Sequence, residues 1–147
     1  MNDYIIRLAT KDDCLDIERL EKDYGVDVYS MSSILSTFDY DYYHNYVILI
    51  DNKVIGYISA TIICDECNLI KIIIDKNYRK NGYGRVLLNS LIEKCKENKV
   101  NKIFLEVRSD NGVAKKFYQA LGFRLESIRS GYYDGVDAEI LWYYIND

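Results

Sequence analysis

A glycine-rich turn with three cations is the segment of this sequence best suited to bind a small anion. It lies between an apolar run that ends at Ile74 and an amphipathic stretch that begins near Gly84. Gly82 and Gly84 have no Cβ, so the backbone can approach a ligand closely, and N–H groups at a helix start converge on phosphate oxygens. The residues predicted to hold a diphosphate are Arg79, Lys80, Asn81, Gly82, Tyr83, Gly84 and Arg85.

The spacing of this turn excludes two well-known nucleotide-binding loops. It lacks the Gly-Lys-Ser/Thr ending of a nucleoside-triphosphate P-loop. It also does not complete Gly-x-Gly-x-x-Gly, because a leucine stands where the third glycine is needed. On these residues alone, a plain glycine turn with solvated cations stays open as the alternative.

Two further residues could handle protons. Glu106 follows the apolar run Ile103-Phe104-Leu105, where it is either a strand-end residue that reaches solvent or pairs with Arg108, or a general base. Tyr118 lies on the apolar side of a predicted helix, which also suits an ordinary core tyrosine. Asn111 precedes that helix and suits a helix N-cap.

The cysteines do not predict a metal site. Cys64 and Cys67 have the spacing of half a zinc site, but the only histidine, His44, has no matching ligand around it to complete a second pair. We therefore predict no metal. All four cysteines, which include Cys14 and Cys95, are expected to be reduced thiols.

The remaining sequence predicts the elements that position these residues. Apolar and β-branched runs predict strands at 4–8, 46–50, 54–64, 69–74, 102–107, 124–129 and 137–144. Helical spacing predicts helices at about 14–24, 30–37, 84–96 and 113–120, and turns fall at 51–53 and 132–135. We predict a single domain over residues 1–147 of mixed α+β class. Its central sheet is expected to be twisted and mostly antiparallel, with helices on both faces.

Composition limits the partners and the compartment. The chain has 147 residues, 49% of them hydrophobic, which is enough to bury a core without disulfides. No uninterrupted apolar run reaches the roughly 18 residues of a membrane span, and 1–3 shows no basic flank or apolar signal region. We expect no membrane association and a cytoplasmic location. The net charge of −4 disfavours nucleic acid and favours a cationic partner.

Four ordered motifs point to a family. They are Arg79-x-x-Gly82-x-Gly84 after a strand, Leu105-Glu106-Val107-Arg108-Ser109-Asp110-Asn111, Ala114-x-x-Phe117-Tyr118-x-x-Leu121-Gly122-Phe123, and Tyr132-Tyr133-Asp134-Gly135-Val136-Asp137-Ala138. Together they resemble the acetyl-CoA-binding core of the GNAT superfamily of N-acetyltransferases over nearly the whole domain. Within that superfamily the sequence is most similar to the ribosomal-protein alanine N-acetyltransferases and to relatives that acetylate protein N-termini.

This resemblance implies acetyl-CoA as co-substrate and assigns residues to it. The turn at 79–85 would hold the diphosphate, and Asn111 matches a residue that touches the coenzyme. Main-chain groups would pair with the pantetheine amides as an added strand would, and they belong to Ile72, Ile73 and Ile74.

The resemblance also implies the catalytic and acceptor residues. Glu106 would take the proton from the incoming amine, through water, and Tyr118 would protonate the departing thiolate. Tyr132 and Tyr133, predicted in the last hairpin loop, would position the peptide backbone. The opposite substrate wall is expected in the region that contains Tyr29, Tyr40, Tyr42 and Tyr43.

The acceptor predicted from this similarity is the α-amine of a protein or peptide N-terminus, with a ribosomal protein the leading candidate. Two alternatives stay open. A small-molecule amine acetyltransferase would need a closed acceptor pocket, and the Tyr132-Tyr133 loop argues against one. A non-catalytic acetyl-CoA-binding module would lack Glu106 and Tyr118, and the sequence contains both.

Overall fold

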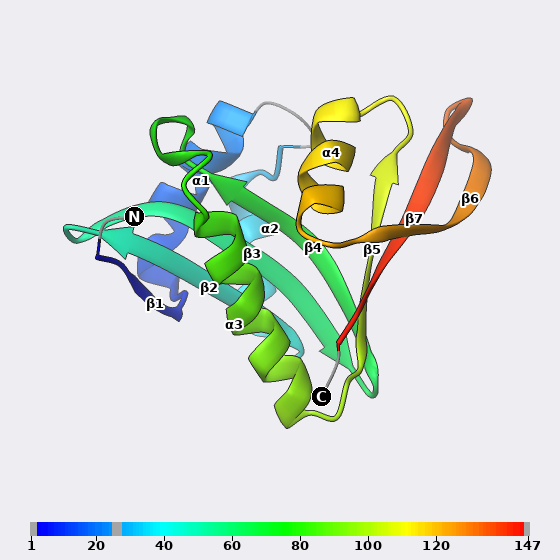
Figure 1. The fold of residues 1–147 in the computed structure, drawn as a ribbon. Coiled ribbons are helices and arrows are strands. Elements are labelled where there is room, and N and C mark those ends of the chain that lie inside the picture. The colour runs from blue at the N-terminus through cyan, green and yellow to red at the C-terminus, as the bar shows by residue number, and fades with distance from the viewer. Residues whose placement is uncertain (1–2, 25–27, 146–147) are drawn as a thin grey trace.

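One twisted sheet organises the chain (Figure 1). The computed structural model describes residues 3–24 and 28–145. Within them, seven strands pair in the order β1-β2-β3-β4-β5-β7-β6, and every neighbouring pair is antiparallel except β4 with β5. The predicted α+β class and mostly antiparallel sheet are confirmed. The strands are β1 (Ile5–Leu8), β2 (Tyr43–Ile50), β3 (Lys53–Ile63), β4 (Glu66–Ile74), β5 (Lys102–Arg108), β6 (Arg124–Tyr133) and β7 (Val136–Tyr144).

Helices cover both faces of the sheet, as predicted. α1 and α2 lie behind the sheet in Figure 1, whereas α3 and α4 lie in front of it. The helices are α1 (Cys14–Tyr24), α2 (Met31–Ser36), α3 (Tyr83–Glu97) and α4 (Gly112–Ala120), with short 3-10 turns at Lys11–Asp13, Thr37–Asp39 and Lys76–Tyr78.

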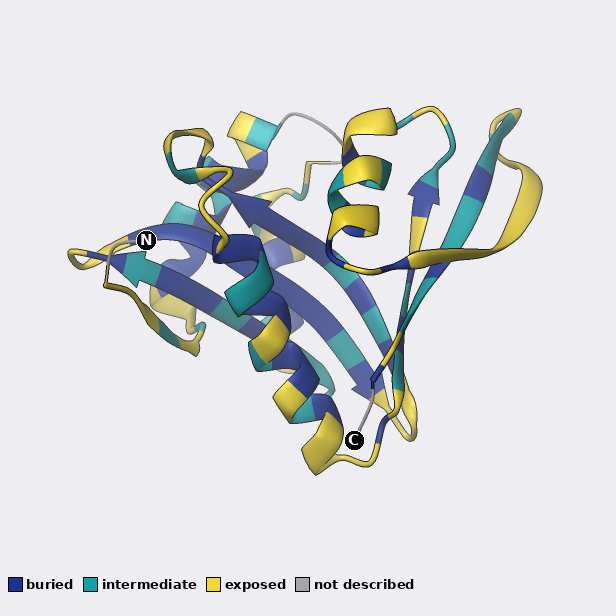
Figure 2. Ribbon diagram, viewed as in Figure 1, coloured by how far each residue is buried: buried dark blue, intermediate teal, exposed yellow. Residues whose placement is uncertain are grey.

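The two layers of helices create two cores. β2, β3 and β4 are buried on both faces and therefore consist largely of apolar residues, whereas the edge strand β6 is exposed (Figure 2). The larger core joins the sheet to α3 and α4 and includes Ile58, Ile72, Leu87, Leu91 and Phe123. The smaller core joins the sheet to α1 and α2 and includes Ile17, Leu20, Val47, Tyr57 and Ile73.

β4 and β5 pair only at their beginnings. Cys67 faces Ile103 and Asn68 faces Phe104, and beyond these two pairs the strands diverge (Figure 1). The divergence leaves one edge of β4 without a neighbouring strand. It creates a wedge whose open end lies beside α4.

A β-bulge sits in β4 where the wedge begins. Lys71 pairs with Ser59 in β3, and the next pair is Leu69 with Ala60. Ile70 is therefore an extra residue without a partner, and such bulges bend a strand and re-aim its side chains.

Two-residue turns close the hairpins more tightly than the sequence predicts. Asp51 and Asn52 have φ of 50° and 64°, and Asp134 and Gly135 have φ of 47° and 92°, as type I′ turns require. β6 therefore continues to Tyr133, which pairs with Val136. The predicted loop at 132–135 is wrong at its first two positions, because Asp134 and Gly135 supply the whole turn.

Some predictions concern residues outside the described part of the chain. These are residues 1–2, on which the prediction of a missing signal region partly rests, and residues 25–27 in the segment between Tyr24 and Tyr46. Among the described residues, the helices are too short or too polar to cross a bilayer.

Candidate active site

The two glycines of the predicted phosphate turn have different roles. Gly82 is the N-cap of α3 with φ of 85°, and no atom lies within 4 Å of the position that a Cβ would take. A Cβ on Gly84 would lie 2.9 Å from Cζ of Phe117. Gly82 thus provides a left-handed backbone in front of open space. Gly84, predicted to admit a ligand, is instead required where α3 packs against α4.

The polar side chains of this turn mostly hold its shape. Nε of Arg79 donates to the carbonyl of Ile74 at 2.9 Å, and Nδ2 of Asn81 donates to the carbonyls of Tyr78 and Arg79 at 3.2 and 3.1 Å. Lys80 is exposed and has a positive φ of 63°. At a helix start the first N–H groups point out of the helix, and this is where an anion can bind.

Two other predicted phosphate contacts lie differently from what the sequence suggests. The ring of Tyr83 is buried and packs edge-on against Tyr4 and Tyr78, so only its backbone can contribute to the turn. The guanidinium of Arg85 donates to the carbonyl of Ala120 at 3.4 Å, at the end of α4.

The open edge of β4 presents alternate residues to the wedge. The amide of Asp75 donates to the carbonyl of Ile55 in β3 at 2.7 Å, and the carbonyl of Ile73 also faces β3. Backbone groups alternate in direction along a strand, so those of Ile72 and Ile74 face away from β3. Of the three predicted pantetheine contacts, Ile72 and Ile74 have backbone groups on the edge that faces the wedge, where the carbonyl of Ile74 already accepts from Arg79, and those of Ile73 face β3.

Asp75, which the sequence analysis missed, fixes the end of β4 at the phosphate turn. Its buried carboxylate lies 3.2 Å from Arg19 of α1 and 3.9 Å from Lys53, and it accepts from the amide of Asn77 at 3.0 Å. An aspartate directly after an apolar strand and before a glycine turn is the sequence signal that could have identified it.

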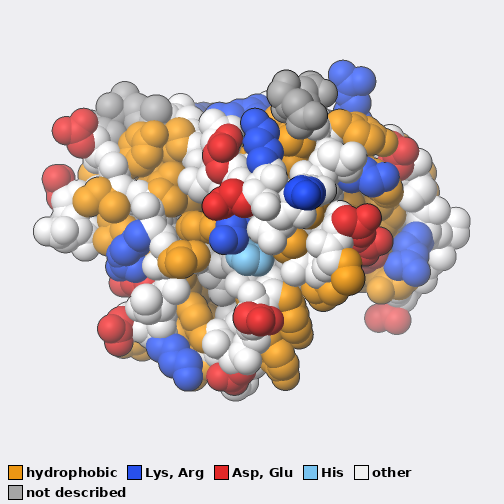
Figure 3. All heavy atoms as spheres, turned by 90° about the horizontal axis from the view of Figure 1, so that it is seen from below, with side chains coloured by type: hydrophobic (Ala, Val, Ile, Leu, Met, Phe, Trp, Pro, Cys, Tyr) orange, Lys and Arg blue, Asp and Glu red, His pale blue; other side chains and the backbone are white. Residues whose placement is uncertain are grey.

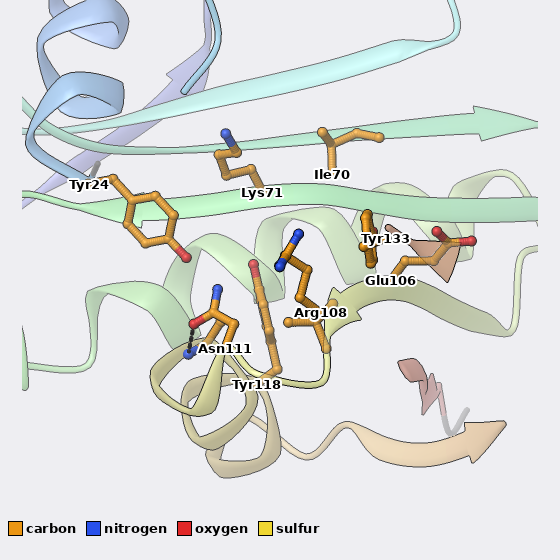
Figure 4. Close-up of a pocket in the computed structure, with 10 residues that line it drawn as sticks. Tyr24, Ile70, Lys71, Glu106, Arg108, Asn111, Tyr118 and Tyr133 are labelled. Carbon is orange, nitrogen blue, oxygen red and sulfur yellow. Dashed lines mark hydrogen bonds between the residues drawn. The ribbon is translucent and has the colours of Figure 1, made fainter. Parts of the chain in front are cut away.

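A small cavity of about 60 Å³ lies in the wedge (Figure 4). It joins residues from β4, β5, α4 and the end of β6 with one from α1. Its lining includes Tyr24, Lys71, Glu106, Arg108, Asn111, Tyr118 and Tyr133. The structure thus brings both predicted proton-handling residues to one cavity.

Tyr118 contributes a buried hydroxyl to this cavity. Its side chain rises from α4 toward β4 (Figure 4), and only 8% of the residue is exposed. Burial raises the pKa of this phenol well above its ordinary value, the nearby Tyr24 adds to the rise, and a hydrogen bond with the backbone of Ile72 opposes it. The hydroxyl therefore stays protonated at neutral pH and can serve as a proton donor.

Glu106 lies on the face of β5 opposite the buried Leu105 and Val107. Its Oε1 accepts from Arg129 of β6 at 3.1 Å. The alternative pairing of Glu106 with Arg108 is wrong, because Asp110 binds both the Nε and an Nη of that arginine at 3.1 Å.

A second, larger groove of about 410 Å³ borders the same glutamate. It runs over β5, β6 and β7 and reaches the turn between β3 and β4. Glu106 and Arg129 line it together with the aromatic residues Phe104 and Trp142. Glu106 is thus shared by the small cavity and the open groove.

Of the remaining predicted contacts, two line the small cavity and one does not. Asn111 caps α4, since its Oδ1 accepts from the amide of Ala114 at 3.1 Å, and it also lines the cavity. Tyr133 lines the cavity with its ring 5.4 Å from the Arg108 guanidinium. Tyr132 does not line it, because it is 51% exposed and stacks over Arg129.

The tyrosine-rich wall expected from the sequence is only partly present. Tyr40, Tyr42 and Tyr43 stack on one another, with neighbouring ring centroids 5.2 to 6.5 Å apart, and line neither cavity. Tyr24, at the end of α1, does line the small cavity. The helical pattern of α1 made Tyr24 look like an ordinary packing residue.

No group of three or more metal-ligating side chains occurs in the part of the chain that the structure describes. Cys64 is exposed and Cys67 is buried beside Cys95, so the two cysteines of the zinc-like spacing point to different environments. Acidic, basic and apolar side chains are interspersed over the face that carries the histidine (Figure 3).

A diverging strand pair, a helix start facing it and a buried tyrosine that reaches from α4 toward β4 make up the candidate site. Residues 12–123 match the Acetyltransferase (GNAT) family model, and the chain belongs to this family. It is therefore an N-acetyltransferase that uses acetyl-CoA as co-substrate.

Relatives with assigned names lie close in sequence and structure. The chain is 34% identical over 95 residues to the ribosomal protein bS18-alanine N-acetyltransferase of Escherichia coli K12, a match that spans 65% of this chain and 64% of that enzyme. A Bacillus subtilis protein with a provisional name of the same kind is 36% identical over 108 residues, 72% of each chain. The crystal structure of the S18-alanine N-acetyltransferase from Escherichia coli superposes with a TM-score of 0.85 at 28% identity, covering 99% of this chain and 96% of that one.

Proposed function

We propose that this enzyme acetylates the N-terminal α-amine of a protein or peptide, with a ribosomal protein as the leading candidate. The names of its relatives support this acceptor. The observation that carries the proposal is the position of Glu106, which borders both the small cavity beside Tyr118 and the large open groove. An extended peptide can place its first residue in the former and continue along the latter.

The proposed chemistry divides proton transfer between two residues. Glu106 accepts the proton of the attacking amine through a water molecule, and the oxygen not engaged by Arg129 is the one available for it. The amine attacks the thioester carbon, and the carbon–sulfur bond then breaks. Tyr118 donates its proton to the departing coenzyme thiolate.

The coenzyme would lie along the wedge. Backbone groups of Ile72 and Ile74 would pair with its pantetheine amides, and the first N–H groups of α3, beside Gly82, would bind its diphosphate. Arg79, Lys80 and Arg85 add positive charge to that end. Asn111 would contact the coenzyme from the α4 side while it caps that helix.

The acceptor type follows from amine chemistry. At pH 7.4 an α-amine with a pKa of ~7.8 is roughly a quarter neutral, whereas a lysine amine with a pKa of ~10.4 is only about a thousandth neutral. A single exposed carboxylate base is better matched to the α-amine. Tyr133, which lines the cavity, would contact the peptide backbone of the first residues.

Mass mapping of acetylated peptides tests the proposal. Each peptide carries a free N-terminus and an internal lysine, and a matched peptide has the same sequence with a blocked N-terminus. We expect acetylation at the α-amine and little turnover of the blocked peptide. Modification mainly on lysine, or turnover only with free polyamines, contradicts the proposal.

A further inference from the structure

A buried ion pair lies beside the small cavity, between α1 and β4. Nζ of Lys71 is 2.7 Å from Oε1 of Glu21, and the side chains are 9% and 0% exposed. Removing two charges from water costs more than a pair usually recovers, and apolar residues of similar size are often as stable or more so. Stability alone does not explain this pair.

The pair holds the end of α1 and the following segment against the sheet. Oε1 of Glu21 also accepts from the backbone amide of Tyr29 at 3.1 Å, and the ammonium of Lys71 lies 4.2 Å from the centroid of the Tyr29 ring. Glu21 and Lys71 thus tie α1 and the approach to α2 to β4, which lies 50 residues further along the chain.

The same pair reaches the reaction centre through β4. Lys71 lines the small cavity and points toward α1, on the side away from Tyr118 (Figure 4). It follows the bulged Ile70 and precedes Ile72, whose backbone contacts the Tyr118 hydroxyl. Lys71 therefore lies in the cavity wall and next to the residue that contacts the proton donor.

The second carboxylate oxygen of Glu21 takes no part in the ion pair. Oε2 of Glu21 is buried and has no hydrogen-bond partner among the described residues. A buried carboxylate oxygen without a partner is costly. This cost adds to that of removing the two charges from water, so stability does not account for Glu21.

We propose that Glu21 and Lys71 form a positioning pair for the acceptor. The pair sets the distance between β4 and the end of α1, where Tyr24 lines the small cavity, and so fixes where the first acceptor residue lies relative to Tyr118. This inference rests on the proposed function, since it assumes an acceptor amine in the small cavity. Neither residue takes part in proton transfer.

The test compares wild type with the double variant Glu21→Leu/Lys71→Met. Removing both charges together keeps either residue from leaving the other unpaired, although the amide of Tyr29 loses its acceptor, so the melting temperature should stay near that of wild type. Acetyl-CoA affinity by calorimetry should stay close to wild type, while the KM for the acceptor peptide rises about tenfold or more, as for other lost positioning contacts. Unchanged KM and kcat would show that the pair is only structural.

Two further variants keep the result decisive. Lys71→Arg retains the charge but changes the geometry at Glu21, so it should raise the acceptor KM at an unchanged melting temperature, and it decides the question if the double variant does not fold. Asp13→Asn weakens the other end of the same helix and should lower the melting temperature without changing KM.

Wild-type activity separates the two proposals. If wild type acetylates lysine or polyamines instead of α-amines, the proposed function fails. If wild type acetylates α-amines, and the double variant and Lys71→Arg both keep the wild-type KM for the acceptor, the positioning role fails.

Discussion

Tyr118 acquires its chemistry from its surroundings rather than from its place in the sequence. The chain has fifteen tyrosines, and a helical pattern alone cannot tell a core tyrosine from a proton donor. The structure places this hydroxyl in the cavity, against the backbone of Ile72, with its pKa raised by burial. A phenol that remains protonated throughout the neutral range is a suitable acid for a thiolate.

Replacing Tyr118 by phenylalanine should lower kcat by ~10²–10⁴, the range for a lost acid–base group, with little change in acetyl-CoA affinity. Because the pKa of Tyr118 is raised, wild-type kcat should not decline on the alkaline side up to about pH 9.5, where an ordinary phenol begins to ionise. Stopped assays across this pH range, with calorimetry for the coenzyme, measure both effects.

Glu106→Gln is the companion variant. It should also lower kcat, because the group that accepts the proton of the amine is gone. Near-full turnover in both variants would mean that the amine and the thiolate exchange protons with water.

At the scale of elements, the phosphate turn depends on how α3 is packed as well as on its own residues. Arg79 and Asn81 stabilise the turn through backbone carbonyls, and Asp75 fixes the strand before it. The glycines then separate two functions: Gly82 keeps the space above the helix start free, and Gly84 allows α3 to meet Phe117 closely.

Substitutions at the two glycines should therefore differ in kind. Gly82→Asn should retain most of the stability, because asparagine tolerates a positive φ, yet it should weaken acetyl-CoA binding strongly, and Gly82→Val should abolish it. Gly84→Ala should lower the free energy of unfolding by about 1–3 kcal/mol, as overpacking does. Calorimetry and urea unfolding distinguish the two effects. Wild-type affinity in both Gly82 variants would disprove the role of this turn.

At the scale of the molecule, much of the fold could be predicted because apolar residues recur along the sequence at clear strand and helix spacings. The apolar runs of β2 to β4 and the amphipathic face of α3 identify their elements directly. What could not be predicted depends on distant contacts. The reach of Arg129 across β7 to Glu106 and the buried pair of Lys71 with Glu21 join segments whose relative positions exist only after folding.

The candidate site also has a part that the sequence could predict and a part that it could not. Glu106, Tyr118 and Asn111 could be placed in one site by motif similarity, and they do line one cavity. The alternation that turns Ile73 away from the wedge depends on the register with β3, and the register is shifted by the bulge at Ile70. Within an apolar run, the sequence pattern does not reveal where a bulge lies.

The stability of the domain in acid should depend in part on the ion pair between Arg7 and Asp13. The two Nη atoms of Arg7 in β1 donate to the Asp13 carboxylate, at 2.8 and 2.9 Å, and Asp13 also accepts from the amide of Thr10. The hydrogen bonds from Arg7 lower the pKa of Asp13 in the folded state. Its stabilisation is therefore fully present above the unfolded pKa of about 3.9 and is lost as the pH falls through the lower folded value.

Asp13→Asn should lower the free energy of unfolding at pH 7 by about 1.5–3 kcal/mol, the range for hydrogen bonds to charged groups. The difference from wild type should shrink as the pH falls below about 4. Urea unfolding at several pH values measures it, with the exposed neighbour Asp12→Asn as a control that should change little. A difference that stays constant from neutral to acid pH would contradict the prediction.

If the coenzyme lies between the diverging strands β4 and β5, the supply of acetyl-CoA should also affect the lifetime of the protein. Coenzyme that binds only the folded chain stabilises it by about 2.7 kcal/mol when its free concentration is a hundred times Kd. A change of that size alters the unfolded fraction by roughly two powers of ten, and it is this fraction that proteases degrade. When acetyl-CoA is scarce, less of the enzyme should be bound to it, and the enzyme should then be degraded faster.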